Sequence, residues 1–247
     1  MKSFLLFLFS CLTVSLHAQS LNAGLGMHLP VGTQKDKLKN AYGLTIGYER
    51  PIKKSPFYLV ADLSWSIFDL KTTEQEVVSP SDGYVTKQKI NYTSSLFNLT
   101  PGIGYAPLRN NNISPYVAIK GGYLKYKTRM TLHDPEDEDG CHPLDEENIL
   151  RDLAAIGVAN GGVAFKIPTW RTTYHLDLGV NYITGGKAKF LRMKKDNAQP
   201  TPPEAVPYMT KFQQVQTGDV HEHTLGDVYT TKTSQLQFYV RVKIPFL

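Results

Sequence analysis

Two pairs of side chains have the types needed for acyl transfer or hydrolysis. His175 and Asp177 are two positions apart, as are Ser64 and Ser66, and residues two apart share one face of a strand. A serine activated by a histidine that an acid orients is a common nucleophile. No enzyme motif surrounds these residues, and a histidine beside an aspartate in a polar interior is more often a structural pair. A lipid-modifying hydrolase using His175 stays an alternative, but we expect no catalytic residue and no enzyme.

A dense group of carboxylates between residues 131 and 155 could bind divalent cations through its oxygens. An EF-hand frame would place Asp137, Asp139 and Glu146 at ligand positions, but Pro135 then stands where the first carboxylate is needed. We expect a solvated acidic loop with no resident metal, and loose divalent bridging to lipopolysaccharide is the alternative. The acidic residues are Asp134, Glu136, Asp137, Glu138, Asp139, Asp145, Glu146 and Glu147. The stretch from Leu144 to Ala155 is expected to form a short surface helix.

Three further residues alternate in a second metal-like pattern. Asp219, His221 and His223 share one parity, and alternating histidines on a strand can chelate Zn²⁺ or Cu²⁺. Two histidines and an acid in a long polar segment are far more often plain surface. We therefore expect no metal and no cofactor here either.

A basic stretch precedes a proline-rich one. Such a stretch at the outer rim of a membrane protein could contact anionic lipid head groups. Residues 200–207 contain four prolines and are expected to be extended rather than folded. The basic residues are Lys187, Lys189, Arg192, Lys194 and Lys195.

The composition excludes several classes of protein. The chain has 247 residues, 41% of them apolar and 20% charged, with a formal net charge of +5. This is too polar for a helical membrane protein and too apolar for a disordered one. The small net charge and the lack of a basic-aromatic motif argue against nucleic-acid binding. Fourteen Tyr, 19 Gly and 15 Pro favour a β-rich chain with many turns.

The N-terminus has the features of an export signal. Lys2 is followed by an apolar run, and small Ala18 precedes polar residues, so residues 1–18 are predicted to be a cleaved signal peptide. The mature chain, 19–247, would then keep Cys141 as its single cysteine and could form no internal disulfide. No later stretch is apolar and long enough for a membrane helix, so strands are the expected spanning elements.

Apolar and polar residues alternate along most of the mature chain, which is the pattern of strands with one apolar face. The last two strands are the clearest, because each places five or six apolar residues at every second position. Eight strands are predicted: 21–31, 42–49, 57–67, 97–105, 116–127, 163–167, 174–182 and 236–246.

The predicted connections alternate in length. Residues 51–56, 106–114 and 168–171 are short links, whereas the other four connections lengthen along the chain and the last three are much longer. Short turns at one rim, long loops at the other and an even strand count are typical of an up-and-down transmembrane barrel. We therefore predict an all-β, eight-stranded antiparallel barrel with short periplasmic turns and long outer loops.

The chemistry of the two parities indicates which face is outside. The polar parity is rich in small residues and carries isolated charges of both signs, as the narrow lumen of an eight-stranded barrel requires. The apolar parity carries aromatic pairs that would form two girdles at the membrane interfaces. A soluble periplasmic barrel with an apolar cavity is the alternative. The lumen charges are Glu49, Asp62, Asp177, Arg241 and Lys243, and the aromatic pairs are Phe57 and Trp65, Tyr174 and Tyr182, Phe238 and Phe246, and Tyr42 and Tyr48.

Glycine-rich alternating strands such as 43–48 and 115–123, together with the signal peptide and the last strand, make residues 19–247 resemble a known family. These are the small eight-stranded outer-membrane barrels of the porin family, similar to the barrel of outer membrane protein A. The resemblance implies a place in the outer membrane of a Gram-negative bacterium. It also implies outer-membrane lipid, lipopolysaccharide and the insertion machinery as partners.

Within this class, we expect a non-catalytic barrel whose long outer loops carry a structural role or bind a surface ligand. A narrow transport pore is the alternative from a different functional class.

Overall fold

The strands form one closed antiparallel sheet, as the alternation predicts. The computed structural model describes residues 20–53, 55–78, 84–109, 111–133, 143–169, 173–194, 200–213 and 220–245. Neighbouring strands pair in the order β1-β2-β3-β4-β5-β6-β7-β9, and β9 pairs again with β1. The barrel strands are β1 (Ser20–Pro30), β2 (Ala41–Pro51), β3 (Phe57–Val78), β4 (Val85–Tyr105), β5 (Ile113–His133), β6 (Pro143–Pro168), β7 (Thr173–Met193) and β9 (Val220–Pro245). A further strand, β8 (Val206–Gln213), pairs with the outer half of β9.

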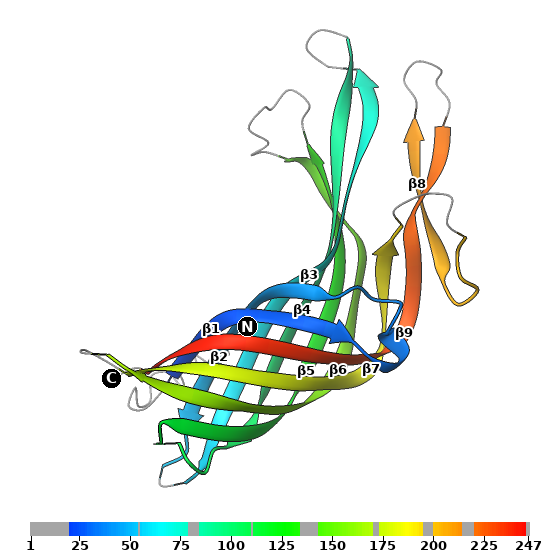
Figure 1. Ribbon diagram of the computed structural model, residues 1–247. Coiled ribbons are helices and arrows are strands. Elements are labelled where there is room, and N and C mark those ends of the chain that lie inside the picture. Colours follow the sequence, from blue (N-terminus) through cyan, green and yellow to red (C-terminus); the bar gives the residue numbers. More distant parts are fainter. Residues whose placement is uncertain are drawn as a thin grey trace, which may run out of the picture.

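One rim of the barrel carries the short turns, as predicted. Residues 52–56, 106–112 and 169–172 join β2 to β3, β4 to β5 and β6 to β7. Ser20 pairs with Pro245, so the two ends of the described chain meet at this same rim. Antiparallel neighbours joined in sequence, closed by the first and last strands, leave no unpaired edge around the barrel body. Figure 1 shows this closed body with strands projecting from its other end.

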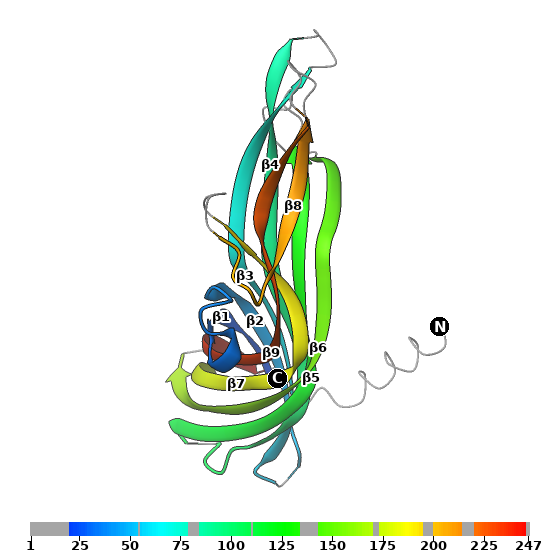
Figure 2. The ribbon, with the colours of Figure 1, turned by 90° about the vertical axis from the view of Figure 1, so that its right-hand side faces the viewer.

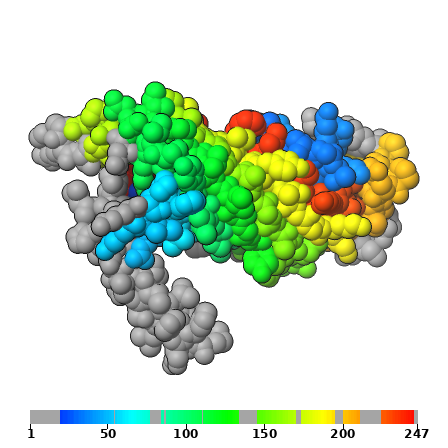
Figure 3. Space-filling view, turned by 90° about the horizontal axis from the view of Figure 1, so that it is seen from below, coloured from blue at the N-terminus to red at the C-terminus, as the bar shows by residue number. Residues whose placement is uncertain are grey.

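The wall of the barrel has an apolar outer face. Leu25, Leu44, Ile103 and Ile119 are all more than half exposed to the surroundings, and Ile119 is 79% exposed. Of the aromatic residues predicted to form girdles, Phe57, Trp65, Tyr42, Tyr182 and Phe238 are exposed on this face. Tyr48 and Tyr174 are partly buried, and Phe246 lies outside the described residues. Figure 3 shows the neighbouring strands on one side of the barrel as a continuous surface. A surface this apolar is stable against hydrocarbon and not against water, which removes the soluble-barrel alternative.

The strands are much longer than the alternation predicts. β3 to β7 and β9 hold 21 to 26 residues each, whereas about 9 to 11 tilted residues cross a membrane. Most of the predicted loop between the third and fourth strands is a ladder from Asp69–Ser94 to Val78–Val85. The apolar alternation ends where the hydrocarbon ends, but the backbone pairing continues. These extensions rise from the barrel body in Figures 1 and 2.

Two local predictions were wrong. The segment from Leu144 to Ala155 is part of β6 and not a helix, because β5 lies alongside and pairs with it from His133–Pro143 through Tyr123–Ala155. The proline-rich segment 200–207 is not simply extended, since the backbone N–H of Ala205 donates to the carbonyl of Pro202 and closes a turn. β8 then begins at Val206.

The connection between β1 and β2 folds over the outer mouth of the barrel. It contains the short 3₁₀ helix η1 (Gly32–Gln34), and the backbone N–H of Val31 donates to Ser234 O at 3.0 Å. Gly32 has a φ of 57°, a left-handed conformation that glycine adopts without a steric penalty. This turn carries Gln34 and Leu38 into buried positions. No helix in the described segments is long and apolar enough to cross a membrane.

Candidate functional site

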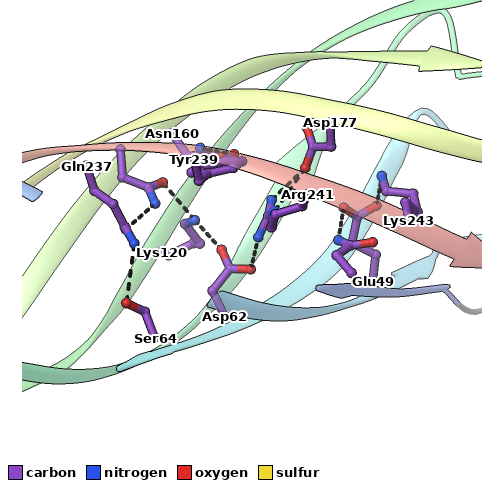
Figure 4. A network of polar contacts seen from close by, with 12 residues as sticks. Glu49, Asp62, Ser64, Lys120, Asn160, Asp177, Gln237, Tyr239, Arg241 and Lys243 are labelled. Atoms are coloured by element: carbon purple, nitrogen blue, oxygen red, sulfur yellow. Dashed lines mark hydrogen bonds and ion pairs between the residues drawn. The ribbon is translucent and has the colours of Figure 1, made fainter. Parts of the chain in front are cut away.

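The middle of the lumen is filled by a charged network centred on Arg241. Its guanidinium donates to Asp62 Oδ1 at 2.7 Å, and its Nε and Nη2 donate to Asp177 Oδ2 at 3.0 and 2.8 Å. Lys120 Nζ contacts Asp62 Oδ2 at 2.5 Å and Asn181 Oδ1 at 3.0 Å. Figure 4 shows these groups converging from β3, β5, β7 and β9. All four charged side chains are buried, so the two carboxylates and the two cations neutralise each other away from water.

Tyrosine rings pack beside this network over glycines. Tyr116 donates to Asp177, its hydroxyl lies 2.7 Å from that of Tyr239, and the Arg241 guanidinium stacks 4.0 Å above the Tyr239 ring. A Cβ at Gly179 would overlap the Tyr239 hydroxyl, and one at Gly162 would overlap that of Tyr116. Glycine is therefore favoured at positions 162 and 179, because the tyrosine rings fill the space that a larger side chain would need.

His175 and Asp177, the pair on which the alternative of a hydrolase depended, have different surroundings. Asp177 is bound by Arg241 and Tyr116, and His175 lies at the short-turn end of the lumen. Ser64 instead contacts His28, whose Nε2 lies 3.3 Å from Ser64 Oγ and whose Nδ1 lies 3.1 Å from Gln235 Oε1. His28 was not predicted as a partner of Ser64, although it lies on the polar face of the first strand.

The contact between Ser64 and His28 has the residue types of a nucleophile and its base. Both side chains are almost fully buried, and Gln237 also donates to Ser64 Oγ at 3.3 Å. A nucleophile needs an open position beside it for the reacting atom. Ser64 is instead enclosed by lumen side chains, so the arrangement is suited to filling the barrel.

The outer half of the lumen is closed by an apolar plug. The rings of Phe68, Tyr126, Phe190 and Tyr229 contact one another, with centroids 5.4 to 6.3 Å apart. Leu38 from the turn over the mouth packs into the same buried cluster. The plug and the charged network together occupy the outer and middle parts of the lumen.

The projecting strands form a second core above the barrel, which we call the outer head. It packs Ile90 and Tyr92 of β4 against Leu191 and Met193 of β7 and Leu225 of β9. Met130 and Leu132 of β5, Ile149 and Leu150 of β6, Tyr208 of β8 and Val228 of β9 add to it. Burial raises the pKa of the Tyr92 and Tyr208 hydroxyls above their ordinary value, so both stay protonated near neutral pH. The outer end is therefore a packed element and not a set of separate loops.

The residues considered as metal ligands in the sequence, where no metal was predicted, fall largely outside the described part. Residues 134–142, including Asp134 to Asp139 and Cys141, and Asp219 lie there. Within β6, Glu146 forms an ion pair with Arg129, while His221 and His223 belong to β9. Among the residues the structure describes, no group of three or more His, Cys, Asp or Glu is arranged to hold a metal ion.

The basic stretch predicted near residue 190 is divided by the fold. Lys187 and Lys189 are exposed on β7, whereas Lys194 is buried and its Nζ lies 3.1 Å from Asp227 Oδ1. Arg192 donates to the backbone carbonyl of Asp36. Lys195 lies outside the described residues. Lys187 and Lys189 are therefore the exposed lysines of this stretch in the described part of the chain, and a contact with anionic lipid head groups stays a prediction.

A different basic cluster lies just beyond the apolar band, and we call it the basic patch. It comprises Lys125, Lys127, Arg129 and Arg151, which follow exposed Tyr123 on the outward parity of β5 and β6. Lys127 pairs in register with Arg151. Partial burial, then repulsion from Arg129 and Lys125, lowers the pKa of Lys127. The sequence shows no single basic run here, because Lys125, Lys127 and Arg129 alternate with Tyr126 and Thr128. Arg151 joins them only through the pairing of β5 with β6.

A closed eight-stranded sheet with an apolar exterior and a neutralised polar lumen defines a transmembrane β-barrel. Only such a barrel satisfies every backbone group of a strand within hydrocarbon. The structure therefore confirms the fold predicted from the sequence, on the closure of the sheet and the chemistry of its two faces.

Comparisons with known proteins give structural likenesses at low sequence identity. Neisserial surface protein A has a TM-score of 0.46 and 11% identity, with 92% of this chain and 97% of that chain covered. The attachment invasion locus protein of Yersinia pestis has a TM-score of 0.40 and 11% identity, with 92% and 99% covered. A major outer membrane protein of Thermus thermophilus has a TM-score of 0.40 and 13% identity, with 93% and 98% covered. No family model and no curated protein matches the sequence.

Proposed function

We propose that this protein is a non-catalytic barrel of the outer membrane of a Gram-negative bacterium, and that the outer head binds a surface partner. One observation carries the proposal. The strands continue past the apolar band into a packed head, while the middle and outer lumen are filled by side chains. A chain that only spanned the membrane would not need the head, and a pore would need an open lumen.

Export and assembly are part of the same proposal. Residues 1–18 act as a cleaved signal peptide, and the insertion machinery of the outer membrane closes the barrel. The short-turn rim then faces the periplasm, because the termini and short turns of such barrels lie on that side. The outer head accordingly faces the exterior of the cell.

The basic patch favours lipopolysaccharide as the lipid partner. Four cations on neighbouring strands lie directly beyond the lipid-facing residues. This is the level at which the anionic head groups of the lipid lie. Arginine binds phosphate oxygens in a bidentate geometry, and lysine adds point charge. Arg129 is also paired with Glu146, so Lys125, Lys127 and Arg151 are the cations we assign to lipid phosphates.

Gel mobility of protein extracted from purified outer membranes tests the location and the closure of the barrel together. We expect the unheated protein to run differently from the boiled protein, because a closed sheet resists detergent until heated. The control is the same extraction applied to the periplasmic fraction. A soluble, unshifted protein in the periplasm would contradict the proposal.

Retention of lipopolysaccharide by the purified barrel tests the lipid contact. The double variant Lys127→Gln with Arg151→Gln should retain about half as much lipopolysaccharide or less, because each cation contributes about 1 kcal/mol at an anionic surface. Lys53→Gln, an exposed lysine in a short turn at the opposite rim, is the matched control and should retain the wild-type amount. Equal retention by all three proteins would remove the basic patch from the proposal.

A further inference from the structure

A cavity of about 600 Å³ opens at the short-turn end of the lumen. It lies at the opposite end of the molecule from the outer head and is independent of the function proposed for the head. Its wall is partly aromatic and apolar, with Tyr58, Tyr116, Pro51, Ala106 and Ala164. This end of the lumen differs from the middle and the outer end, because side chains leave space here.

Positive charge exceeds negative charge around the cavity. Arg109, Lys166 and Lys243 line it together with one carboxylate, Glu49. Lys243 Nζ lies 2.7 Å from Glu49 Oε2, and Asn22 donates to Glu49 Oε1 at 2.9 Å. Arg109 Nη2 is more distant, 3.8 Å from Glu49 Oε2. Glu49 is therefore compensated by Lys243 and Asn22, which leaves the charge of Arg109 and Lys166 largely available to a ligand.

Three residues around the same cavity have a buried polar atom without a partner. Arg109 Nη1, His175 Nδ1 and Ser20 Oγ are inaccessible to solvent and have no hydrogen-bond partner among the described residues. All three residues line the cavity. Buried polar groups in proteins are nearly always hydrogen-bonded, so three orphans around one space indicate groups arranged for a missing partner.

We propose that this cavity binds the phosphate or carboxylate group of an organic anion. The guanidinium of Arg109 matches the planar, bidentate geometry of both groups, and Lys166 adds charge at the rim. The Arg109 guanidinium lies 5.5 Å from the centroid of the Tyr58 ring and Lys243 Nζ lies 6.0 Å from that of Tyr116, so these rings help to hold the cations in place. The apolar wall of Pro51, Ala106 and Ala164 is left for the rest of the ligand. The anion comes either from the head group of a phospholipid in the adjacent leaflet or from a soluble anion on that side of the membrane.

Binding of phenyl phosphate tests the proposal, because this probe combines a ring with a phosphate. Calorimetric titration of the intact barrel in zwitterionic detergent should give saturable binding with one site per chain. Arg109→Gln should weaken the affinity about tenfold or more, since hydrogen bonds to charged groups are among the stronger ones. Lys166→Gln should weaken it by a smaller factor.

The matched control is Lys232→Gln, which removes an exposed lysine on the part of β9 that pairs with β7 near Lys187, at the other end of the barrel. It should bind the probe as tightly as the wild type. Each variant must retain the heat-dependent gel shift, which separates loss of the site from loss of the fold. No saturable binding by the wild type, or equal weakening in Lys232→Gln and Arg109→Gln, would overturn the proposal.

A second readout follows the orphaned histidine directly. The ring signals of His175, assigned by comparison with His175→Gln, should shift as phenyl phosphate fills the cavity, and the other histidine signals should stay in place. Unmoved His175 signals at saturating probe would count against the site. Phosphatidylglycerol in a nanodisc identifies the source of the anion. If it competes with the probe, the natural ligand is a lipid head group, and if it does not, the ligand is a soluble anion.

Discussion

At the scale of single residues, the lumen depends on groups that compensate one another. Arg241 is shared by Asp62 and Asp177, and Lys120 completes the neutral set. Removing one member would leave a buried charge without its partner, which typically costs about 3 to 5 kcal/mol. The network therefore favours the one arrangement of β3, β5, β7 and β9 in which these charges meet.

The glycines beside the lumen tyrosines give the sharpest test at this scale. Gly179→Ala should lower the free energy of unfolding by about 1 to 3 kcal/mol, because the new Cβ would meet the hydroxyls of Tyr239 and Tyr116. Gly157→Ala is the matched control, since a Cβ added there would have nothing within 4 Å. Urea unfolding of the barrel in lipid vesicles measures both variants. Equal stability of the two would show that the rings move aside without cost.

At the scale of the elements, the sequence predicts the part of each strand that faces lipid. The alternation from Leu236 to Ile244 is strict because one face meets hydrocarbon and the other meets the lumen. Beyond the membrane, polar residues occur on both the outward and the inward face of a strand, so the alternation is lost. Thr72 and Glu74 on β3 are polar on the outward parity, and Thr73 between them is polar as well. No local pattern could therefore show that the ladder continues to Val78.

The candidate site was predicted only in part, for a related reason. The lumen charges were visible as isolated charges on the polar parity of the strands. Their partners depend on the register between strands, which brings Asp62 and Arg241 together across 179 positions of sequence. The cavity around Arg109 lies in a turn region, where alternation carries no information. Only the closed fold brings Arg109 next to Glu49 and His175.

The outer head can be tested as an element separate from the barrel. Tyr92→Ser should loosen it, because Tyr92 is 1% exposed and lies in its core. Limited proteolysis of intact cells should then cut the projecting strands faster, while the heat-dependent gel shift of the barrel stays. Val206→Ser at the start of β8 is the matched control, since that valine is 66% exposed. Loss of the gel shift in Tyr92→Ser would mean that the head and the barrel fold as one unit.

At the scale of the whole molecule, the contents of the lumen decide between a pore and a filled barrel. An eight-stranded barrel has an interior just wide enough for side chains. Here the apolar plug closes the outer part, the charged network fills the middle, and the cavity reaches only the short-turn end. An ion entering from that end would meet Arg241 and its two aspartates, which are buried and fully engaged with one another.

We therefore expect no single-channel conductance when the heat-shifted protein is inserted into planar bilayers. The charged network cannot open without separating buried charges, and the plug above it consists of packed rings. A wide porin added to the same bilayer is the positive control for the recording. Reproducible current steps of one size, seen with the unheated protein and absent after boiling, would contradict this expectation. Such steps would require that the plug and the network move together, because either one alone closes the lumen.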